Sequence, residues 1–355
     1  MFFFNPSLAQ QNQPPLNKAS LSEDEVKTAV SQIASKYHLQ NVYFYLEDDG
    51  ITRYDVVFGG SDPDKPTPVG SLSKSITGIA IAILLQEHKI ELKSTIGELL
   101  GGLYGRNNRE IDGNLSKVTI ERLLTHTAGL RPNRNTDPVN GITTNEGLRR
   151  LVGYSNPTAF DFLKENNADN STGSTAFLYS NLSYLILGMV IEEVSGESYE
   201  SFCRSRIIGP LGITDASLIG SPYRPIAAYN GWILSRRDVA KIWREVFDRN
   251  HPTLLSGATL NRTLFAPLGR PLGAGGAVRY VMGNYIKKTG PRSYDLYHDG
   301  QINTSLAGFS SPGNFDSYIE DRVPGQIWSI AISPIPDGQA FKEAISDFRA
   351  LVGSQ

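Results

Sequence analysis

Ser71 and Lys74 are the first residues in the chain whose spacing suggests chemistry, in the run Ser-Leu-Ser-Lys. Helical positions three apart lie on one face, so this spacing places an amine beside a hydroxyl. A serine hydroxyl is a weak nucleophile until a base takes its proton, and a buried lysine can serve as that base. The spacing predicts an activated serine. The alternative is a helix-capping serine next to a solvated lysine.

Two further triplets carry polar side chains that fit the same chemistry. Tyr179-Ser180-Asn181 supplies a phenol, which ionises more easily near an ammonium group, and an amide that offers both a donor and an acceptor. His298-Asp299-Gly300 follows an aromatic run, and its glycine would let a substrate backbone lie close to a strand edge. Taken singly, each triplet also fits a structural role, such as a core tyrosine, a capping asparagine or a buried histidine.

In this order, the three motifs resemble those of the penicillin-recognising serine hydrolases, in the branch that holds class C β-lactamases, D,D-carboxypeptidases and many esterases. Two longer runs add to the resemblance, Thr119–Leu130 and Tyr179–Tyr184 followed by Gly188. The similarity extends over roughly residues 40–335 and is specific for the family but not for the substrate. It implies an α/β (α+β) β-lactamase-like fold, in which helices flank an antiparallel sheet and a mostly helical lobe is added.

The resemblance also implies a role for each motif residue. Ser71 would be the acylated nucleophile, and Lys74 with Tyr179 would form the base that activates it and then protonates the leaving group. The backbone N–H groups of Ser71 and Gln301 would form the oxyanion hole, where such a donor typically contributes about 3–4 kcal/mol. The residues expected to bind the substrate are Asn181, His298, Asp299 and Gly300.

Three details bear on the third motif and the substrate. Lys288-Thr289-Gly290 spells the β-lactamase form of this motif, but it lies in a Pro/Gly-rich turn, so we favour His298.

Relatives usually carry a hydroxyl residue at the middle position of the third motif, where it binds a substrate carboxylate. Asp299 would repel a carboxylate if it faces the site, and the alternative is that it points away. Ser174–Phe177 stands where relatives usually carry Pro-Gly, which predicts a reshaped loop beside the site.

The sequence therefore predicts a serine hydrolase that acts through an acyl-enzyme on ester or amide bonds, of the carboxylesterase or amidase–peptidase type. Alternatives with the same chemistry are a β-lactamase, a D-Ala-D-Ala carboxypeptidase and an acyltransferase. An alternative of another class is a non-catalytic ligand-binding relative. The expected partner is a small ester, amide or short peptide, and the oligomeric state stays open. No cofactor or metal is expected, because none of the five histidines pairs with carboxylates at metal-ligand spacing.

Periodicity predicts the elements that must position these residues. Ser22 and Glu25 form a capping box at the start of an amphipathic helix over residues 22–38. Asp48-Asp49-Gly50 predicts a hairpin turn between two strands, and Ile76–Leu85 is apolar all round, as a buried central helix would be. We expect strands at Asn41–Glu47, Ile51–Phe58, Ala277–Lys287, Tyr294–Tyr297, Ser305–Ser310 and Gln326–Ile332, and further helices at Thr119–His126, Glu146–Val152, Tyr184–Val194, Tyr199–Ile208, Ser235–Asn250 and Ala340–Leu351.

Strand signals at both ends of the chain predict one shared sheet. Residues 20–70 together with 270–355 would form this sheet lobe, and residues 71–269 a mostly helical lobe, with the active site between the two. Residues 1–19 are expected to be a tail or the remnant of a secretory signal. That signal-like start favours a secreted or periplasmic protein and leaves a cytoplasmic one open.

Composition excludes several classes of protein. The chain has 34 Lys and Arg residues against 36 Asp and Glu residues, a net charge of −2. This near-neutral charge does not indicate a nucleic-acid-binding protein. Its single cysteine, Cys203, rules out an internal disulfide and a cysteine-based metal site. The longest apolar stretch is about ten residues, half of what a membrane span needs, so no span is expected.

Overall fold

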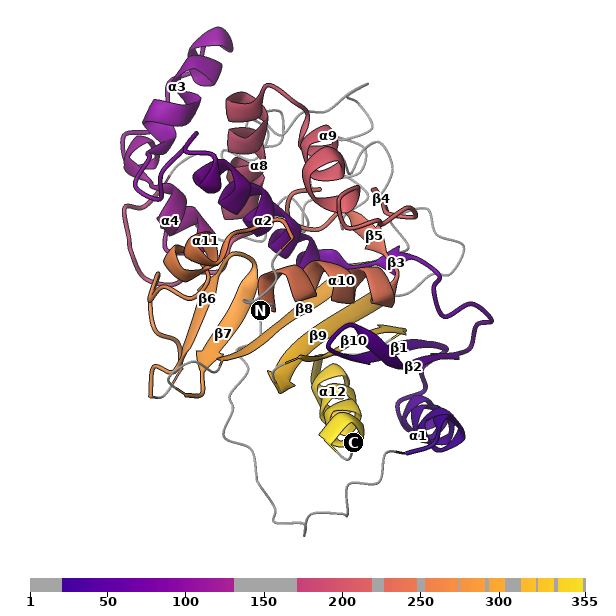
Figure 1. The fold of residues 1–355 in the computed structure, drawn as a ribbon. Helices are drawn as coiled ribbons and strands as arrows, with labels where there is room; N and C mark the ends of the chain where they lie inside the picture. Colours follow the sequence, from indigo (N-terminus) through magenta and orange to yellow (C-terminus); the bar gives the residue numbers. More distant parts are fainter. Residues whose placement is uncertain are drawn as a thin grey trace.

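The computed structural model describes residues 21–130, 171–218, 227–247, 253–273, 275–290, 294–303, 314–323, 325–334 and 338–353. A seven-stranded antiparallel sheet runs through the molecule in the order β2-β1-β10-β9-β8-β7-β6 (Figure 1). Its strands are β1 (Asn41–Asp48), β2 (Ile51–Phe58), β6 (Val278–Val281), β7 (Asn284–Lys288), β8 (Tyr294–Asn303), β9 (Asn314–Val323) and β10 (Gln326–Ser333). Both ends of the chain contribute to this sheet, as the strand signals predicted.

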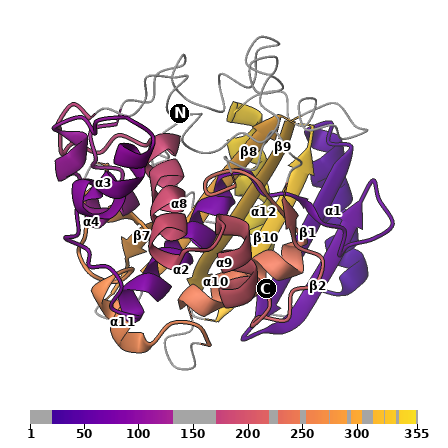
Figure 2. The ribbon, with the colours of Figure 1, turned by 90° about the horizontal axis from the view of Figure 1, so that it is seen from above.

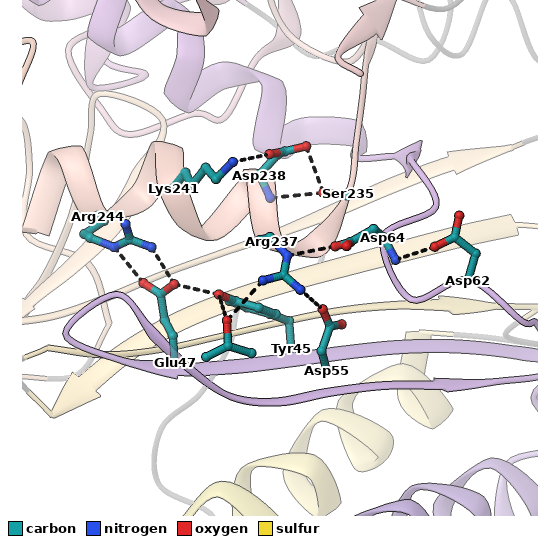
Figure 3. A network of polar contacts seen from close by, with 11 residues as sticks. Tyr45, Glu47, Asp55, Asp62, Asp64, Ser235, Arg237, Asp238, Lys241 and Arg244 are labelled. Atoms are coloured by element: carbon teal, nitrogen blue, oxygen red, sulfur yellow. Dashed lines mark hydrogen bonds and ion pairs between the residues drawn. The ribbon is translucent and has the colours of Figure 1, made fainter. Parts of the chain in front are cut away.

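Helices cover both faces of the sheet. The helices α1 (Glu23–Lys36) and α12 (Gly338–Gly353) lie on one face and share a core with β1 and β10 (Figure 1). The predicted capping box of Ser22 and Glu25 is present at the start of α1. On the other face, α10 (Arg236–Phe247) packs on β10 and β1 and is tied to the hairpin β1–β2 by ion pairs (Figure 3).

The buried helix α2 (Ser73–Gln86) is the centre of the mostly helical part, and the single-turn helix η1 (Gly70–Leu72) precedes it. In Figure 2, α3 (Ile96–Arg106) and α4 (Ile120–Leu124) lie at one end of the molecule and β1 and β2 at the other, with α2 between them. The remaining elements are η2 (Leu115–Lys117), α8 (Asn181–Ser195), α9 (Tyr199–Cys203), the π-helical η3 (Arg204–Ile208), α11 (Gly257–Arg262), and a small sheet of β3 (Thr67–Pro68), β5 (Trp232–Leu234) and β4 (Ser217–Leu218).

The turn between β6 and β7 holds α2 in place. A Cβ on Gly78 would lie 2.5 Å from Met282 O, so helix and turn meet backbone to backbone. The hydroxyl of Ser75 donates to Gly283 O at 2.8 Å, and Gly283 N donates to Tyr184 Oη of α8 at 2.6 Å. The turn therefore fixes α2 and α8 against each other.

Several sequence predictions for the second half of the chain were wrong or too short. The single strand expected over Ala277–Lys287 is a hairpin, because Met282 and Gly283 both adopt positive φ (51° and 79°), as a tight two-residue turn requires. The strand expected over Tyr294–Tyr297 continues to Asn303, and the sequence analysis missed β9. The elements expected at Glu146–Val152 and Ser305–Ser310, and the tail over residues 1–19, lie outside the described residues. The lobe boundaries stay predictions.

Within the described ranges, no helix is both long and apolar enough to cross a membrane.

Candidate active site

Ser71 and Lys74 lie together at the start of α2. Lys74 Nζ donates to Ser71 Oγ at 2.8 Å and to the carbonyl oxygen of Tyr229 at 3.0 Å. The side chain of Lys74 is fully buried, whereas Ser71 is half-buried and keeps access to solvent. The amine is thus aimed at a hydroxyl on a residue that keeps access to solvent, which is the arrangement that the motif spacing predicted.

The segment that carries Ser71 lies directly on strand β8. A Cβ on Gly70 would lie 2.7 Å from Gln301 N, and one on Gly300 would lie 2.9 Å from Ser71 N. A Cβ on Gly300 would also overlap Val69 O. The backbone amides of Ser71 and Gln301, which are expected to form the oxyanion hole, therefore both belong to the close contact between these two segments. The sequence analysis expected a substrate backbone beside Gly300. In the structure, backbone atoms of the chain's own residues Val69 and Ser71 lie there.

Tyr179 lies beside Lys74, as the second motif predicted. Lys74 Nζ is 5.0 Å from the centroid of the Tyr179 ring. Tyr179 is half-buried, and the exposed Leu178 precedes it. Asn181 is the first residue of α8 and is also half-buried, which leaves its amide at the rim of the site.

His298 is buried on β8 and carries no charge at neutral pH. Its Nε2 lies 3.1 Å from Tyr280 Oη, and its ring centroid is 6.5 Å from that of Tyr179. Burial, with a smaller effect of the charge on Lys74, lowers the pKa of His298 to about 3. Burial likewise raises the pKa of Tyr280. The third motif therefore contributes a neutral imidazole to this region.

Asp299 is exposed and alternates with His298 along β8. Its partner on β9 is Tyr318, which packs in the core beside α12, whereas the partner of His298 is Ile319, which packs in the core around α2. Strand alternation thus directs Asp299 to the face opposite His298. Lys288 of the rejected triplet is exposed at the far end of β7 and pairs with Tyr294, so it lies away from the Ser71 region.

The sequence analysis did not assign two further residues, Tyr229 and His126, to this region. Tyr229 supplies the backbone oxygen that Lys74 contacts, and any residue type could supply a carbonyl, so no sequence signal marks it. His126 contacts the Tyr179 ring at a centroid distance of 4.3 Å. The signal for His126 was its place in the Thr119–Leu130 run. In the part of the chain that the structure describes, no group of three or more His, Cys, Asp or Glu side chains could hold a metal ion.

Comparison with solved structures finds the same architecture. A D-stereospecific amidohydrolase from Streptomyces sp. aligns with a TM-score of 0.70 at 21% identity, over 91% of this chain and 98% of that protein. An octameric penicillin-binding protein homologue from Pyrococcus abyssi aligns with a TM-score of 0.69 at 18% identity, over 94% of this chain and 78% of the other. At these identities the likeness establishes the fold.

Comparison of sequences agrees with it. The curated protein flp of Staphylococcus aureus (strain NCTC 8325 / PS 47) is 24% identical over 57% of this chain, and the match spans 40% of that relative's length. The sequence model of the Beta-lactamase family matches residues 26–301, a span that includes all three motifs and both segments of the backbone contact at Ser71. With the fold and the family match in agreement, the chain belongs to the Beta-lactamase family.

Proposed function

We propose that this protein is a serine hydrolase that acts through an acyl-enzyme on ester or amide bonds, of the carboxylesterase or amidase–peptidase type. The observation that carries the proposal is the 2.8 Å hydrogen bond from the fully buried Lys74 Nζ to Ser71 Oγ. Burying an amine is costly, and a ligand-binding cleft without turnover has no need of one aimed at a half-buried serine hydroxyl.

In the proposed reaction, Ser71 Oγ attacks the carbonyl carbon of the substrate. Its proton passes to the Lys74–Tyr179 pair, in which the amine or the phenol is already deprotonated. The N–H groups of Ser71 and Gln301 stabilise the oxyanion that forms. The pair then gives the proton to the leaving alcohol or amine, and the bond to that group breaks. A water molecule repeats the sequence on the acyl-enzyme and releases the acid and free Ser71.

The surroundings of the site favour substrates without a carboxylate beside the scissile bond. Relatives bind such a carboxylate through the third motif. Here that motif holds a buried His298, with a pKa of about 3, and an acidic residue, Asp299, that strand alternation directs to the opposite face of the sheet, so the motif supplies no positive charge at neutral pH. Neutral esters and amides fit this better than penicillins or D-Ala-D-Ala peptides. The fold shared with a D-stereospecific amidohydrolase makes amides of D-amino acids a natural first class to test.

The test is turnover by the wild type and by Ser71→Ala of p-nitrophenyl butyrate, D- and L-phenylalanine amide, and benzylpenicillin. We expect the wild type to hydrolyse the ester or an amide faster than the penicillin. Ser71→Ala should lose at least about a thousandfold in kcat, as nucleophile variants do. Mass spectrometry of the wild type should find the acyl group on Ser71.

Ser35→Ala, on an exposed position of α1, is the matched control and should keep wild-type turnover. Retained turnover in Ser71→Ala would contradict the proposal. Stoichiometric acylation without release would instead support the binding-protein alternative, and faster turnover of the penicillin would support a β-lactamase. Product formation that needs an added alcohol or amine acceptor would identify an acyltransferase.

A further inference from the structure

His126 holds the residues on both sides of Tyr179. Its carbonyl oxygen accepts a hydrogen bond from Leu178 N at 2.8 Å. Its ring Nδ1 accepts one from Ser180 N at 3.2 Å. One residue therefore fixes the backbone immediately before and immediately after the phenol that faces Lys74.

The His126 ring also packs against the phenol itself. The centroids of the His126 and Tyr179 rings are 4.3 Å apart, with 40° between their planes. On its other sides the ring meets Tyr280 at 4.5 Å and Tyr184 at 5.2 Å. His126 is fully buried, and its second ring nitrogen has no hydrogen-bond partner among the described residues. Its one side-chain hydrogen bond to them is thus the bond to Ser180.

The protonation state of His126 suits an acceptor. Burial, together with the charge on Lys74, lowers the pKa of His126 well below its ordinary value. The ring is therefore neutral at neutral pH, with its proton on Nε2 and a lone pair on Nδ1 for Ser180 N–H. The backbone of His126 has a positive φ of 53°, a conformation that few residues other than glycine adopt.

We propose that His126 is a positioning residue that sets the orientation of Tyr179 against Lys74 and Ser71, through its hydrogen bond to Ser180 N and its ring contact. This role rests on the proposed function, in which Tyr179 moves the proton. A misplacement of about 1 Å in such a group can cost on the order of 10²-fold in rate. The effect of His126 should therefore depend on the Tyr179 hydroxyl.

A double-mutant cycle separates this role from a general effect on folding. His126→Phe keeps a ring and removes the acceptor, whereas His126→Asn keeps an acceptor near the place of Nδ1 and tolerates a positive φ. Each is made in the wild type and in Tyr179→Phe. The readouts are kcat and KM on p-nitrophenyl butyrate, whose good leaving group keeps slow variants measurable, and the thermal midpoint from circular dichroism.

We expect His126→Phe to lower kcat about 10²-fold with little change in KM, and His126→Asn to lose at least tenfold less. In Tyr179→Phe, the further loss from His126→Phe should shrink to about threefold or less. A loss that persists in Tyr179→Phe, equal losses in the Phe and Asn variants, or no loss at all would overturn the proposal. If His126→Phe does not fold, His126→Gly serves the same cycle, because glycine accepts the positive φ.

His88 provides a matched control. It has the same left-handed backbone, with φ of 56°, but is exposed at the end of α2. We expect His88→Phe to leave kcat unchanged. That result would show that a phenylalanine at a positive φ is not by itself the cause of the lower kcat of His126→Phe. If Ser71→Ala keeps turnover, the proposed function and the role of His126 fall together. If Ser71→Ala is inactive while His126→Phe matches the wild type, only the role of His126 falls.

Discussion

Lys74, His126 and His298 are three fully or almost fully buried basic residues around one half-exposed serine. Such groups cannot all be charged in a buried region, and the lysine takes part in lowering the pKa of both imidazoles. The neutral imidazoles can then accept hydrogen bonds, as His126 does from Ser180 N. At the scale of residues, burial and the neighbouring lysine together keep both imidazoles neutral.

A dependence of stability on pH follows from His298. Its pKa is about 3 in the folded protein and near 6.5 in an unfolded chain. Between these values the unfolded chain binds a proton that the folded protein does not, so the free energy of unfolding falls as the pH drops from about 6.5 toward 3. One proton corresponds to about 1.4 kcal/mol per pH unit in that window. Urea unfolding at pH 4.5, 5.5 and 7.5 would measure it.

His298→Gln provides the comparison for this prediction. This variant removes one titrating group. The slope of its unfolding free energy with pH should therefore be smaller than that of the wild type, by the contribution of about one proton. The downward shift of the His126 pKa acts in the same direction and should remain in the variant. Identical pH slopes for the two proteins would show that His298 does not titrate in this way.

At the scale of elements, the β6–β7 turn and helix α2 form one contact. The turn touches α2 at Gly78 and is bonded to Ser75, one residue after Lys74. A small shift of the turn would therefore move the amine relative to Ser71. The contact needs residues without side chains at two points, Gly78 and Gly283, where a Cβ would overlap the opposite backbone.

Two glycine-to-alanine variants test this contact with opposite expected signs. Gly78→Ala places a Cβ 2.5 Å from Met282 O and should destabilise the protein by about 1–3 kcal/mol and lower turnover. Gly101 lies in α3 with nothing within 4 Å of a built Cβ, so Gly101→Ala should stabilise by about 0.5–1 kcal/mol. Chemical denaturation measures both. A higher free energy of unfolding in both variants would mean that the turn can move aside for the new Cβ at residue 78 without a loss of stability.

The elements that sequence patterns predicted are those with local signals. The capping box at Ser22, the apolar run of α2 and the hairpin at Asp49-Gly50 each depend on neighbouring residues, and each is present. The strand β9 was missed because Glu320 and Asp321 are typical of exposed loops. Glu320 is buried here, and Arg349 of α12 donates to its carboxylate at 2.9 Å. A partner that far along the chain has no local signature.

The same limit applies to the candidate site. Its side chains follow from three motifs, since the spacing of Ser71 and Lys74 already places amine and hydroxyl together. The backbone oxygen of Tyr229, which also receives Lys74, follows from no residue type. Nor does the close approach of Gly300 to Val69, because it depends on how a segment from each end of the chain meets the other.

At the scale of the whole molecule, α10 joins the middle of the chain to its N-terminal hairpin. Arg244 donates to both carboxylate oxygens of Glu47, at 2.9 and 2.5 Å, and Tyr45 Oη donates to the same carboxylate at 3.0 Å (Figure 3). Arg237 bonds Asp55 at 2.6 Å and Asp64 at 2.9 Å. These pairs anchor the helical part of the molecule to the sheet.

Glu47→Gln should weaken that anchor. Glu47 is fully buried, so the variant removes a buried negative charge that faces Arg244, but Arg244 is itself 35% exposed and water can solvate part of it. We expect a loss of about 1–3 kcal/mol in unfolding free energy, below the cost of breaking a fully buried pair. Glu23→Gln, in the exposed pair with Lys27, should change stability by less than about 0.5 kcal/mol. Equal effects in urea denaturation would contradict the anchoring role.

The pairing of β1 with β10 has a consequence for synthesis on the ribosome. Val42 pairs with Ile332, about 290 residues later, so at about 5–20 residues per second the first strand waits some 15–60 s for its neighbour. Strand β8, which brings Gln301 beside Gly70, is also translated late. A nascent chain therefore carries Ser71 long before it can complete the proposed oxyanion hole, and it should stay chemically inert at least until Gln301 has emerged.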